Sequence, residues 1–283
     1  MRILITGGTG FVGKKLLSKF IEKNYKFIVL TRNRNLNKKN FIYLDKNLKN
    51  ASKKILRFKP TAIVHLATNF QKKHNMDKIS RMIEGNISFG SKILELCKDQ
   101  IKLFVNVNSA YTSLDGKTYD PKDFYSSTKY GFEIILKYFN KYHNFKVVNL
   151  LLADTYGPND KRVKLINVLL RKKNFLKIHN PNDEINYTYI EDVISALNLV
   201  IKYKWKKKWN NFSLFSSESI QIKYLIKKIE KIKRIKIKYM SDSKTKKNFK
   251  FKPKYKKLIG WRNKINLDKG INLILKSDRD KFN

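Results

Sequence analysis

The sequence predicts an α/β fold with a doubly wound parallel sheet and a smaller C-terminal domain. Two observations support this prediction. Short apolar runs alternate with helix-like periodic segments through the first half of the chain, and a glycine-rich turn at residues 6–13 joins the first run to the first periodic segment. Such alternation is typical of parallel strands with helices on both faces, and these sheets bind ligands at the carboxyl ends of their strands.

The first predicted unit is a strand, a turn and a helix. The apolar run 3–5 predicts a buried strand, and the apolar residues of 12–20 share one helical face. Between them, glycine permits a tight turn and lets backbone N–H groups approach a pyrophosphate, which then faces the positive end of the helix. This context predicts a dinucleotide-binding loop of the Rossmann type. Its expected cofactor-binding residues are Gly7, Thr9, Gly10, Phe11, Val12 and Gly13.

The remaining elements follow in chain order. Five more apolar runs predict strands, at 27–30, 41–44, 62–66, 103–107 and 147–151. Helical patterns lie between them, for example at 87–97, which is the arrangement of a parallel sheet with crossover helices.

The pattern loosens after Gly157-Pro158, where segments 190–201 and 219–232 predict two further helices. We expect a dinucleotide-binding Rossmann domain over 1–157. A mainly substrate-binding domain should cover 158–283, with one segment, about 186–205, returning to the first domain.

The bulk properties indicate a soluble globular protein. The chain has 283 residues and 42% hydrophobic content, enough for a sizeable core. A single cysteine, Cys97, excludes a disulfide framework and is typical of a reducing compartment. No signal-peptide pattern precedes the first strand, and no apolar run approaches the ~18 residues of a membrane span. The expectation is a cytoplasmic protein without a membrane span.

The net charge of +41 has two interpretations. The lysines are spread through every segment, which favours a solvated basic surface, while a real polyanion site remains the alternative. No basic stripe interleaved with aromatic residues and no known nucleic-acid motif is present. No specific nucleic-acid partner is therefore expected. His65 and His179 lack metal-ligand spacing, so no metal is expected either.

Tyr125 and Lys129 are the candidate catalytic pair. Four residues apart, they share one helical face, and a nearby ammonium should lower the tyrosine pKa from about 10 and make it a usable proton donor and acceptor. The same spacing recurs at three other tyrosines: 142, 203 and 224. Only Tyr125 follows shortly after the fifth strand, whose end carries Ser109, a hydroxyl able to hydrogen-bond a substrate carbonyl.

Together these positions resemble the extended short-chain dehydrogenase/reductases that act on nucleotide sugars, also called the NAD-dependent epimerase/dehydratase family. The resemblance runs nearly end to end, and rests on the 6–13 turn together with His65-Leu66-Ala67, Asn86, Ser109, Tyr125-x-x-x-Lys129, Tyr156-Gly157-Pro158, Asp192-Val193 and Leu258-x-Gly260-Trp261. His65-Leu66-Ala67-Thr68 and the short gap from Ser109 to Tyr125 are similar to CDP-abequose synthase-like 4-ketosugar reductases.

The resemblance implies roles for individual residues. Tyr125 would exchange a proton with the substrate oxygen, Lys129 would hold the nicotinamide ribose, and Ser109 would orient the carbonyl. The cofactor site would also include Asp45, beside the adenine, and Leu66 and Ala67. Relatives often carry an arginine for the substrate diphosphate where this chain has Ile185, and another on the sixth strand where it has Leu151. Arg162, Lys164 or Arg171 would supply the charge instead. A homodimer is compatible with the resemblance.

Two local departures from the patterns of related enzymes predict the cofactor and the reaction. After the second strand an NAD enzyme keeps a carboxylate for the ribose 2′-hydroxyl, whereas this chain has Thr31-Arg32-Asn33-Arg34. A guanidinium suits a 2′-phosphate, so Arg32 favours NADP(H) over NAD(H), unless it is one more basic residue of a basic chain. Family dehydratases carry Asp-Glu directly after the strand-end hydroxyl, but here Ala110-Tyr111 follow.

The leading hypothesis is NADPH-dependent reduction of a 4-keto-6-deoxy sugar nucleotide in the biosynthesis of surface polysaccharide such as lipopolysaccharide. A sugar-nucleotide epimerase is the alternative within the family, although family epimerases usually hold NAD. The alternative from another class is a non-catalytic dinucleotide- or nucleic-acid-binding protein with a Rossmann fold.

Overall fold

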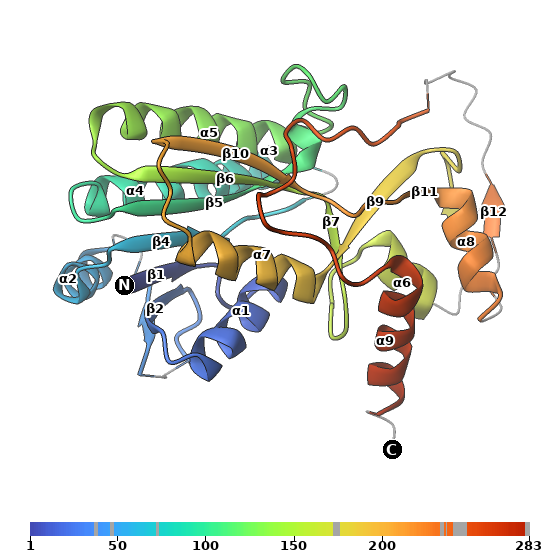
Figure 1. The fold of residues 1–283 in the computed structure, drawn as a ribbon, viewed down its shortest axis with the longest axis horizontal. Coiled ribbons are helices and arrows are strands. Elements are labelled where there is room, and N and C mark those ends of the chain that lie inside the picture. Colours follow the sequence, from blue (N-terminus) through green and yellow to red (C-terminus); the bar gives the residue numbers. More distant parts are fainter. Residues whose placement is uncertain are drawn as a thin grey trace.

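A seven-stranded parallel sheet forms the centre of the molecule, in the order β10-β6-β5-β4-β1-β2-β3 (Figure 1). The computed structural model describes residues 1–36, 39–45, 48–71, 74–171, 176–232, 235, 237–239 and 248–280. The strands of this sheet are β1 (Arg2–Thr6), β2 (Lys26–Thr31), β3 (Phe41–Tyr43), β4 (Ala62–His65), β5 (Leu103–Ser109), β6 (Lys146–Leu152) and β10 (Trp209–Leu214). The predicted doubly wound parallel sheet is confirmed.

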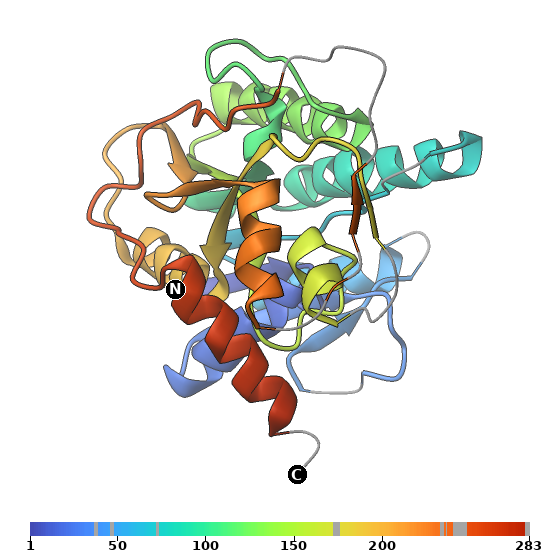
Figure 2. The ribbon, with the colours of Figure 1, turned by 90° about the vertical axis from the view of Figure 1, so that its right-hand side faces the viewer.

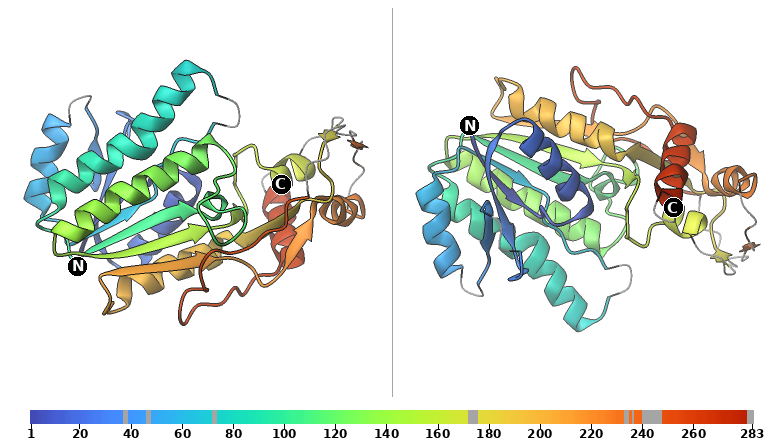
Figure 3. Two further views of the ribbon diagram at one scale, coloured as in Figure 1. Left: turned by 90° about the horizontal axis from the view of Figure 1, so that it is seen from above. Right: turned by 90° about the horizontal axis from the view of Figure 1, so that it is seen from below.

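Helices cover both faces of this sheet, as the views from above and below show (Figure 3). One face packs against α1 (Phe11–Glu22) and α7 (Ile190–Lys202). The other packs against α2 (Lys49–Phe58), α4 (Phe89–Cys97) and α5 (Phe124–Tyr142). In chain order α3 (Met76–Ile83), a π-helical segment η1 (Glu84–Ser88) and α4 follow one another without a break.

Strand β1 shows why the apolar runs become central strands. Ile3 and Ile5 pack into the core on the side of α1, Leu4 packs into the core on the opposite side, and all three are fully buried. A strand covered on both faces reads as a continuous apolar run rather than an alternating one. The following helix buries Leu16 and Phe20, four residues apart, against the same core.

The remaining elements form a smaller part at the carboxyl ends of the central strands (Figure 2). Its three-stranded sheet, in the order β11-β9-β7, contains β7 (Asp154–Tyr156), β9 (Glu184–Tyr189) and β11 (Ser219–Gln221). A second, two-stranded sheet pairs β12 (Ile237–Tyr239) with β8 (Leu176–Ile178). The helices of this part are α6 (Leu165–Arg171), α8 (Ile222–Glu230) and α9 (Leu267–Arg279).

The structure differs from the sequence prediction in two segments. The expected helix over 219–232 begins only at Ile222, because 219–221 pair antiparallel with β9 as strand β11. The Asn186 amide donates to Ser216 O and Glu218 O and so holds this stretch extended. Strand β10 also belongs to the central sheet, although it lies beyond the segment 186–205 that was expected to return to it.

Two of the sequence motifs meet at the C-terminal segment. The Trp261 indole donates to Asp192 O at 2.9 Å and to Ser195 Oγ at 3.0 Å. The Asp192 carboxylate in turn accepts from the backbone N–H groups of Lys264 and Ile265, both at 3.0 Å. These bonds fasten the segment before α9 to α7, and thereby the smaller part to the central sheet.

Candidate active site

The turn between β1 and α1 has the close-packed geometry that a phosphate-binding loop needs. Gly7 has φ +70°, and a Cβ there would lie 2.6 Å from Ala67 N. A Cβ on Gly13 would lie 2.2 Å from Gly7 O, so neither position accepts a side chain without displacing backbone. Helix α1 starts at Phe11 with no side-chain cap and no acidic residue in its first turn. Its N–H groups are therefore suited to an anion.

The other expected cofactor residues line the same edge of the sheet. Arg32 is exposed just after β2, Asp45 follows β3, and Leu66 and Ala67 follow β4. Asp45 Oδ2 accepts from Asn50 N at 3.3 Å, while its Oδ1 is buried and has no hydrogen-bond partner among the described residues. Such an oxygen can accept a hydrogen bond from a ligand amino group. Glycine turn and carboxylate together fit a bound dinucleotide.

His65 has a structural place at the end of β4. Its Nδ1 lies at hydrogen-bond distance, 2.9 Å, from Thr6 Oγ1, and the same hydroxyl oxygen accepts from Ala67 N at 3.2 Å. Burial, with a smaller effect of the Lys129 charge, lowers the pKa of His65 to about 3. The ring stays neutral and holds the floor of the dinucleotide site in place.

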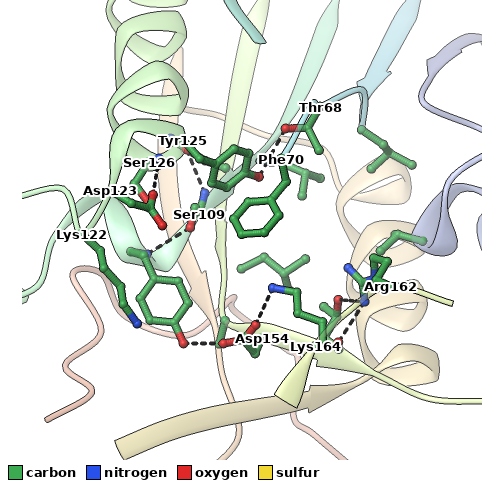
Figure 4. Close-up of a pocket in the computed structure, with 18 residues that line it drawn as sticks. Thr68, Phe70, Ser109, Lys122, Asp123, Tyr125, Ser126, Asp154, Arg162 and Lys164 are labelled. Carbon is green, nitrogen blue, oxygen red and sulfur yellow. Dashed lines mark hydrogen bonds and ion pairs between the residues drawn. The ribbon is translucent and has the colours of Figure 1, made fainter. Parts of the chain in front are cut away.

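A cavity of about 240 Å³ opens beside this site (Figure 4). Ser109, from the end of β5, and Tyr125, from the first turn of α5, both line it. Lys129 lies one turn further along α5 and is 1% exposed. The structure therefore brings the three predicted catalytic residues to one end of the sheet.

Tyr125 faces the end of β4. Its hydroxyl is 3.3 Å from Thr68 Oγ1, and its ring packs edge-on against the Phe70 ring, with the two ring centroids 5.1 Å apart. Burial raises the pKa of Tyr125, and the hydrogen bond to Thr68 offsets only part of this effect. The direction is opposite to the lowering expected from Lys129, because desolvation of the phenolate dominates. The phenol consequently keeps its proton at neutral pH.

Lys129 is a buried cation that lacks a partner in the described part of the chain. We find neither a hydrogen bond nor an ion pair for it among the described residues. Burial lowers its pKa to about 8, so it is still largely charged at pH 7. A buried ammonium in this state is suited to hydroxyl groups of a ligand.

Ser109 is arranged as a hydrogen-bond donor toward the cavity. Its Oγ accepts from Tyr111 N at 3.1 Å, and its proton has no acceptor among the described residues. A neighbouring amide, Asn86, lies in the π-helical segment and joins α5 to the loop after β4. It donates to Thr128 Oγ1 at 2.9 Å and accepts from Asn69 N at 2.6 Å. Such π-helical turns are frequent at functional sites.

The two cations proposed for a substrate diphosphate are both engaged in ion pairs. Arg162 forms two contacts with Asp160, at 2.8 and 2.9 Å, and its guanidinium lies 4.5 Å from the Phe11 ring centroid. Lys164 pairs with Asp154 at 2.8 Å. Both line the cavity, but each charge is already balanced by a carboxylate.

Further residues of the cavity were not selected from the sequence. Tyr111 donates to Asp154 Oδ2 at 2.5 Å. Burial opposes ionisation of Asp154, but the charge and hydrogen bond of Lys164, with the bond from Tyr111, lower its pKa. Lys122 Nζ lies 4.5 Å from the Tyr111 ring centroid and 5.2 Å from that of Phe249, with no carboxylate at ion-pair distance among the described residues.

Position relative to the strands could have identified several of these residues. Thr68, Tyr111 and Asp154 lie two or three residues beyond the ends of β4, β5 and β6. Ligands of a parallel sheet bind there. Lys122 lacks such a signal, because the loop before α5 determines its place.

Two further properties concern the part of the chain that the structure describes. No helix there is long and apolar enough to cross a membrane. Nor do its His, Cys, Asp and Glu side chains form a group of three that could hold a metal ion.

A parallel sheet with a glycine-rich β1–α1 turn, and a Tyr–Lys helix beside a strand-end serine, define the class of dinucleotide-binding short-chain dehydrogenase/reductase folds. The profile of the NAD dependent epimerase/dehydratase family matches residues 3–212, and the chain belongs to this family. The resemblance inferred from the sequence motifs is thereby confirmed.

Individual relatives show the same relationship. CDP-abequose synthase of Yersinia pseudotuberculosis is 26% identical over 212 residues, 71% of this chain and 73% of that protein. dTDP-4-dehydro-6-deoxyglucose reductase of Escherichia coli is 26% identical in an alignment 311 positions long, which covers 99% of this chain and 98% of that protein. The solved structure of UDP-glucuronic acid 4-epimerase from Bacillus cereus, in complex with UDP-glucuronic acid and NAD, has a TM-score of 0.82 at 18% identity over 99% of this chain and 100% of that chain. This last likeness shows the shared fold.

Proposed function

We propose that this protein is an NADPH-dependent reductase of a 4-keto-6-deoxy sugar nucleotide that serves surface polysaccharide biosynthesis. One observation carries the proposal. Ser109 and a protonated Tyr125 line one cavity beside the dinucleotide site, while Ala110-Tyr111 occupy the positions at which dehydratases of the family keep an acid and a base. The relatives named as a synthase of CDP-abequose and as a 4-ketosugar reductase agree with it.

The proposed chemistry divides between the bound cofactor and the chain. When bound, the reduced nicotinamide would supply a hydride to the carbonyl carbon. Tyr125 donates its proton to the carbonyl oxygen, which yields the alcohol, and the Ser109 hydroxyl donates a hydrogen bond to the same oxygen as charge develops on it. The buried charge of Lys129 holds the ribose hydroxyls and favours the phenolate that proton transfer leaves behind.

The choice of NADPH rests on the residues after β2. Arg32 is exposed at this position and forms no hydrogen bond or ion pair with the described residues, so its guanidinium is available to a phosphate. In an NAD enzyme a carboxylate at the place of Arg32 would select the ribose hydroxyl.

The substrate side of the cavity offers a cation for a phosphorylated substrate. Lys122 has aromatic rings beside it and no carboxylate partner among the described residues, in contrast to Arg162 and Lys164. We propose that the paired cations shape the cavity and that Lys122 reaches the substrate.

The test is to incubate the protein with NADPH and a panel of CDP-, dTDP- and UDP-linked 4-keto-6-deoxy sugars and to follow the nicotinamide absorbance. Stoichiometric loss of absorbance with formation of the alcohol is expected for at least one substrate. An epimerase would instead interconvert sugar isomers without net consumption of NADPH. A binding protein would do neither, and either result would refute the reductase proposal.

The assembly proposed for this enzyme is a homodimer. Helix α5 exposes the apolar or aromatic side chains of Ile134, Tyr138 and Tyr142, which a second copy could cover. Sedimentation of the purified protein tests this, and a single species of monomer mass at micromolar concentration would refute it.

A further inference from the structure

A buried carboxylate lies directly behind the catalytic serine. Glu133, on the inner face of α5, has no exposed surface. Its Oε2 accepts from Asn108 Nδ2 at 2.8 Å, and its Oε1 accepts from Tyr119 OH at 2.5 Å, with Lys137 Nζ at 3.3 Å. A charge so deeply buried is retained only where hydrogen bonds and an opposite charge compensate its desolvation. Three different segments supply that compensation here.

The contact with Asn108 determines which way its amide points. A carboxylate can only accept, so the Asn108 NH₂ group must face Glu133 and the amide oxygen must face away from it. That oxygen accepts from Ser109 N at 2.8 Å. Were the amide reversed, its NH₂ group would oppose the Ser109 N–H. Glu133 thus fixes the acceptor that holds the backbone of the catalytic serine.

We propose that Glu133 is a positioning residue, which acts through Asn108 to hold Ser109 at the end of β5 in the orientation that the substrate carbonyl requires. The kinetic part of this inference rests on the reductase function proposed above. A displacement of about 1 Å at a reacting group can cost about a hundredfold in rate. Ser109 lines the same cavity as Tyr125, so rotation of its peptide would carry its hydroxyl away from the carbonyl oxygen.

The second oxygen of the same carboxylate serves a separate purpose. Tyr119 OH also lies 3.3 Å from Tyr255 OH, and Lys254 Nζ lies 3.7 Å from the Tyr119 ring centroid. These contacts of Tyr119 anchor the loop before α5 to the C-terminal segment, away from Ser109. Tyr119→Phe therefore removes one hydrogen bond to Glu133 without touching Asn108, and is the matched control.

The test exchanges the hydrogen-bonding roles of the pair. In Asn108→Asp, two carboxyl groups face each other in the presence of the same Lys137, Tyr119, Tyr255 and Lys254. At low pH one of them keeps a proton and donates as the amide did. As the pH rises that proton is lost, the two carboxylates repel each other, and Ser109 loses its support. We expect kcat to fall about tenfold or more with rising pH, at unchanged Kd for NADPH.

Adding Glu133→Gln to Asn108→Asp restores the pair in reverse. The introduced amide donates to the introduced carboxylate, which still accepts from Ser109 N–H. The double variant should recover most of the lost kcat and the pH profile of the unmodified protein, while Tyr119→Phe should lower the melting temperature and leave kcat within about twofold. The inference is overturned if Asn108→Asp keeps the pH profile of kcat of the unmodified protein. It is also overturned if the double variant recovers the melting temperature but not kcat, or if kcat falls as much in Tyr119→Phe as in Asn108→Asp.

A readout without substrate separates this inference from the reductase proposal. Hydrogen–deuterium exchange of the 103–112 peptide should be faster in Asn108→Asp at high pH and return to normal in the double variant. If no ketosugar is reduced but exchange behaves in this way, the reductase proposal fails and the contact to Ser109 stands. If exchange is the same in all three proteins, the positioning role is wrong.

Discussion

Tyr125 carries its proton at neutral pH because burial raises the pKa of its phenol. This state suits a reductase, which must deliver a proton to the developing alkoxide. The Tyr–Lys spacing was visible in the sequence, but it recurs at exposed positions, and only the place of Tyr125 beside the end of β5 distinguishes it. The direction of the pKa shift was predicted wrongly, because the sequence does not reveal how strongly the surroundings of the phenol oppose its ionisation.

Tyr125→Phe should remove most turnover and leave cofactor binding nearly unchanged. A positioned general acid contributes about a hundredfold to ten-thousandfold, and the ring itself is preserved. Turnover and the Kd for NADPH, the latter by fluorescence titration, test this. Tyr142→Phe, on the same helix but 62% exposed, is the control. Equal losses in the two variants would contradict the assignment.

Arg32 should determine the preference for NADPH. The unmodified protein should bind NADPH more tightly than NADH, and Arg32→Ala should reduce this difference about tenfold or more, since a charge-assisted phosphate contact is worth about 1.5–3 kcal/mol. The ratio of the two dissociation constants is the measurement. Arg34 serves as control, because its guanidinium already lies 4.9 Å from the Tyr43 ring centroid. Equal affinity of the unmodified protein for both cofactors would refute the NADP assignment.

The partners of Arg162 and Lys164 mark the limit of residue-level prediction. Both residues were chosen as cations that could meet a diphosphate, and both line the cavity. Their carboxylate partners are Asp160 and Asp154. Which side chains turn toward each other after β7 depends on the path of the loop into α6, and local sequence does not encode that path.

At the scale of elements, strands β1 to β6 of the central sheet and helix α7 were predicted well because each is a strong local signal, whereas strand β10 was not predicted. The run 27–30 became β2, and the helix predicted at 190–201 became α7 almost residue for residue. Strand β11 was missed because its pairing with β9 joins residues more than thirty positions apart. Sheet pairing of this kind overrides a helical pattern.

Helix α5 combines the functional groups of the site in one stripe. Tyr125, Lys129 and Glu133 recur every four residues, so they project from one face in successive turns. Lys129 and Glu133 on this face are buried, which is unusual for charged residues, while Tyr125 is half-buried. Burial of these charged side chains lowers the stability of the folded protein, but it places them beside the proposed active site.

Lys129→Met should stabilise the protein while it impairs activity. A lowering of the lysine pKa from 10.5 to about 8 corresponds to about 3 kcal/mol of burial cost. Below pH 8 lysine is charged in both states and the full cost applies; between about 8 and 10.5 the folded form releases the proton and the cost fades. Urea denaturation without added cofactor should show a higher free energy of unfolding for Lys129→Met than for the unmodified protein at pH 7. The difference should be smaller at pH 9.5.

The control for this prediction is Lys141→Met, on the exposed side of α5, which should change stability little. A loss of stability in Lys129→Met at pH 7, with no dependence on pH, would show that the buried ammonium is compensated by contacts stronger than its desolvation.

At the scale of the whole molecule, the basic charge is spread over the surface rather than gathered in the site. There are 63 Lys and Arg residues against 22 Asp and Glu, and the cavity cations Arg162 and Lys164 are neutralised locally. We therefore expect the charge to produce weak, sequence-independent binding to nucleic acids that falls steeply with salt, as counterion release requires.

Salt should separate this general attraction from catalysis. At about 0.15 M salt the Debye length is about 8 Å, so the long-range field of the +41 surface is largely screened, whereas a substrate phosphate held directly by Lys122 is screened much less. The Michaelis constant for the sugar nucleotide should therefore rise modestly between low salt and 0.15 M. The kcat should stay almost constant, because proton transfer from Tyr125 takes place inside the cavity. Steady-state kinetics and nucleic-acid binding assays over the same salt series test both parts. Tight, sequence-selective nucleic-acid binding at 0.15 M, with no oxidation of NADPH on any ketosugar nucleotide, would establish the binding-protein alternative instead.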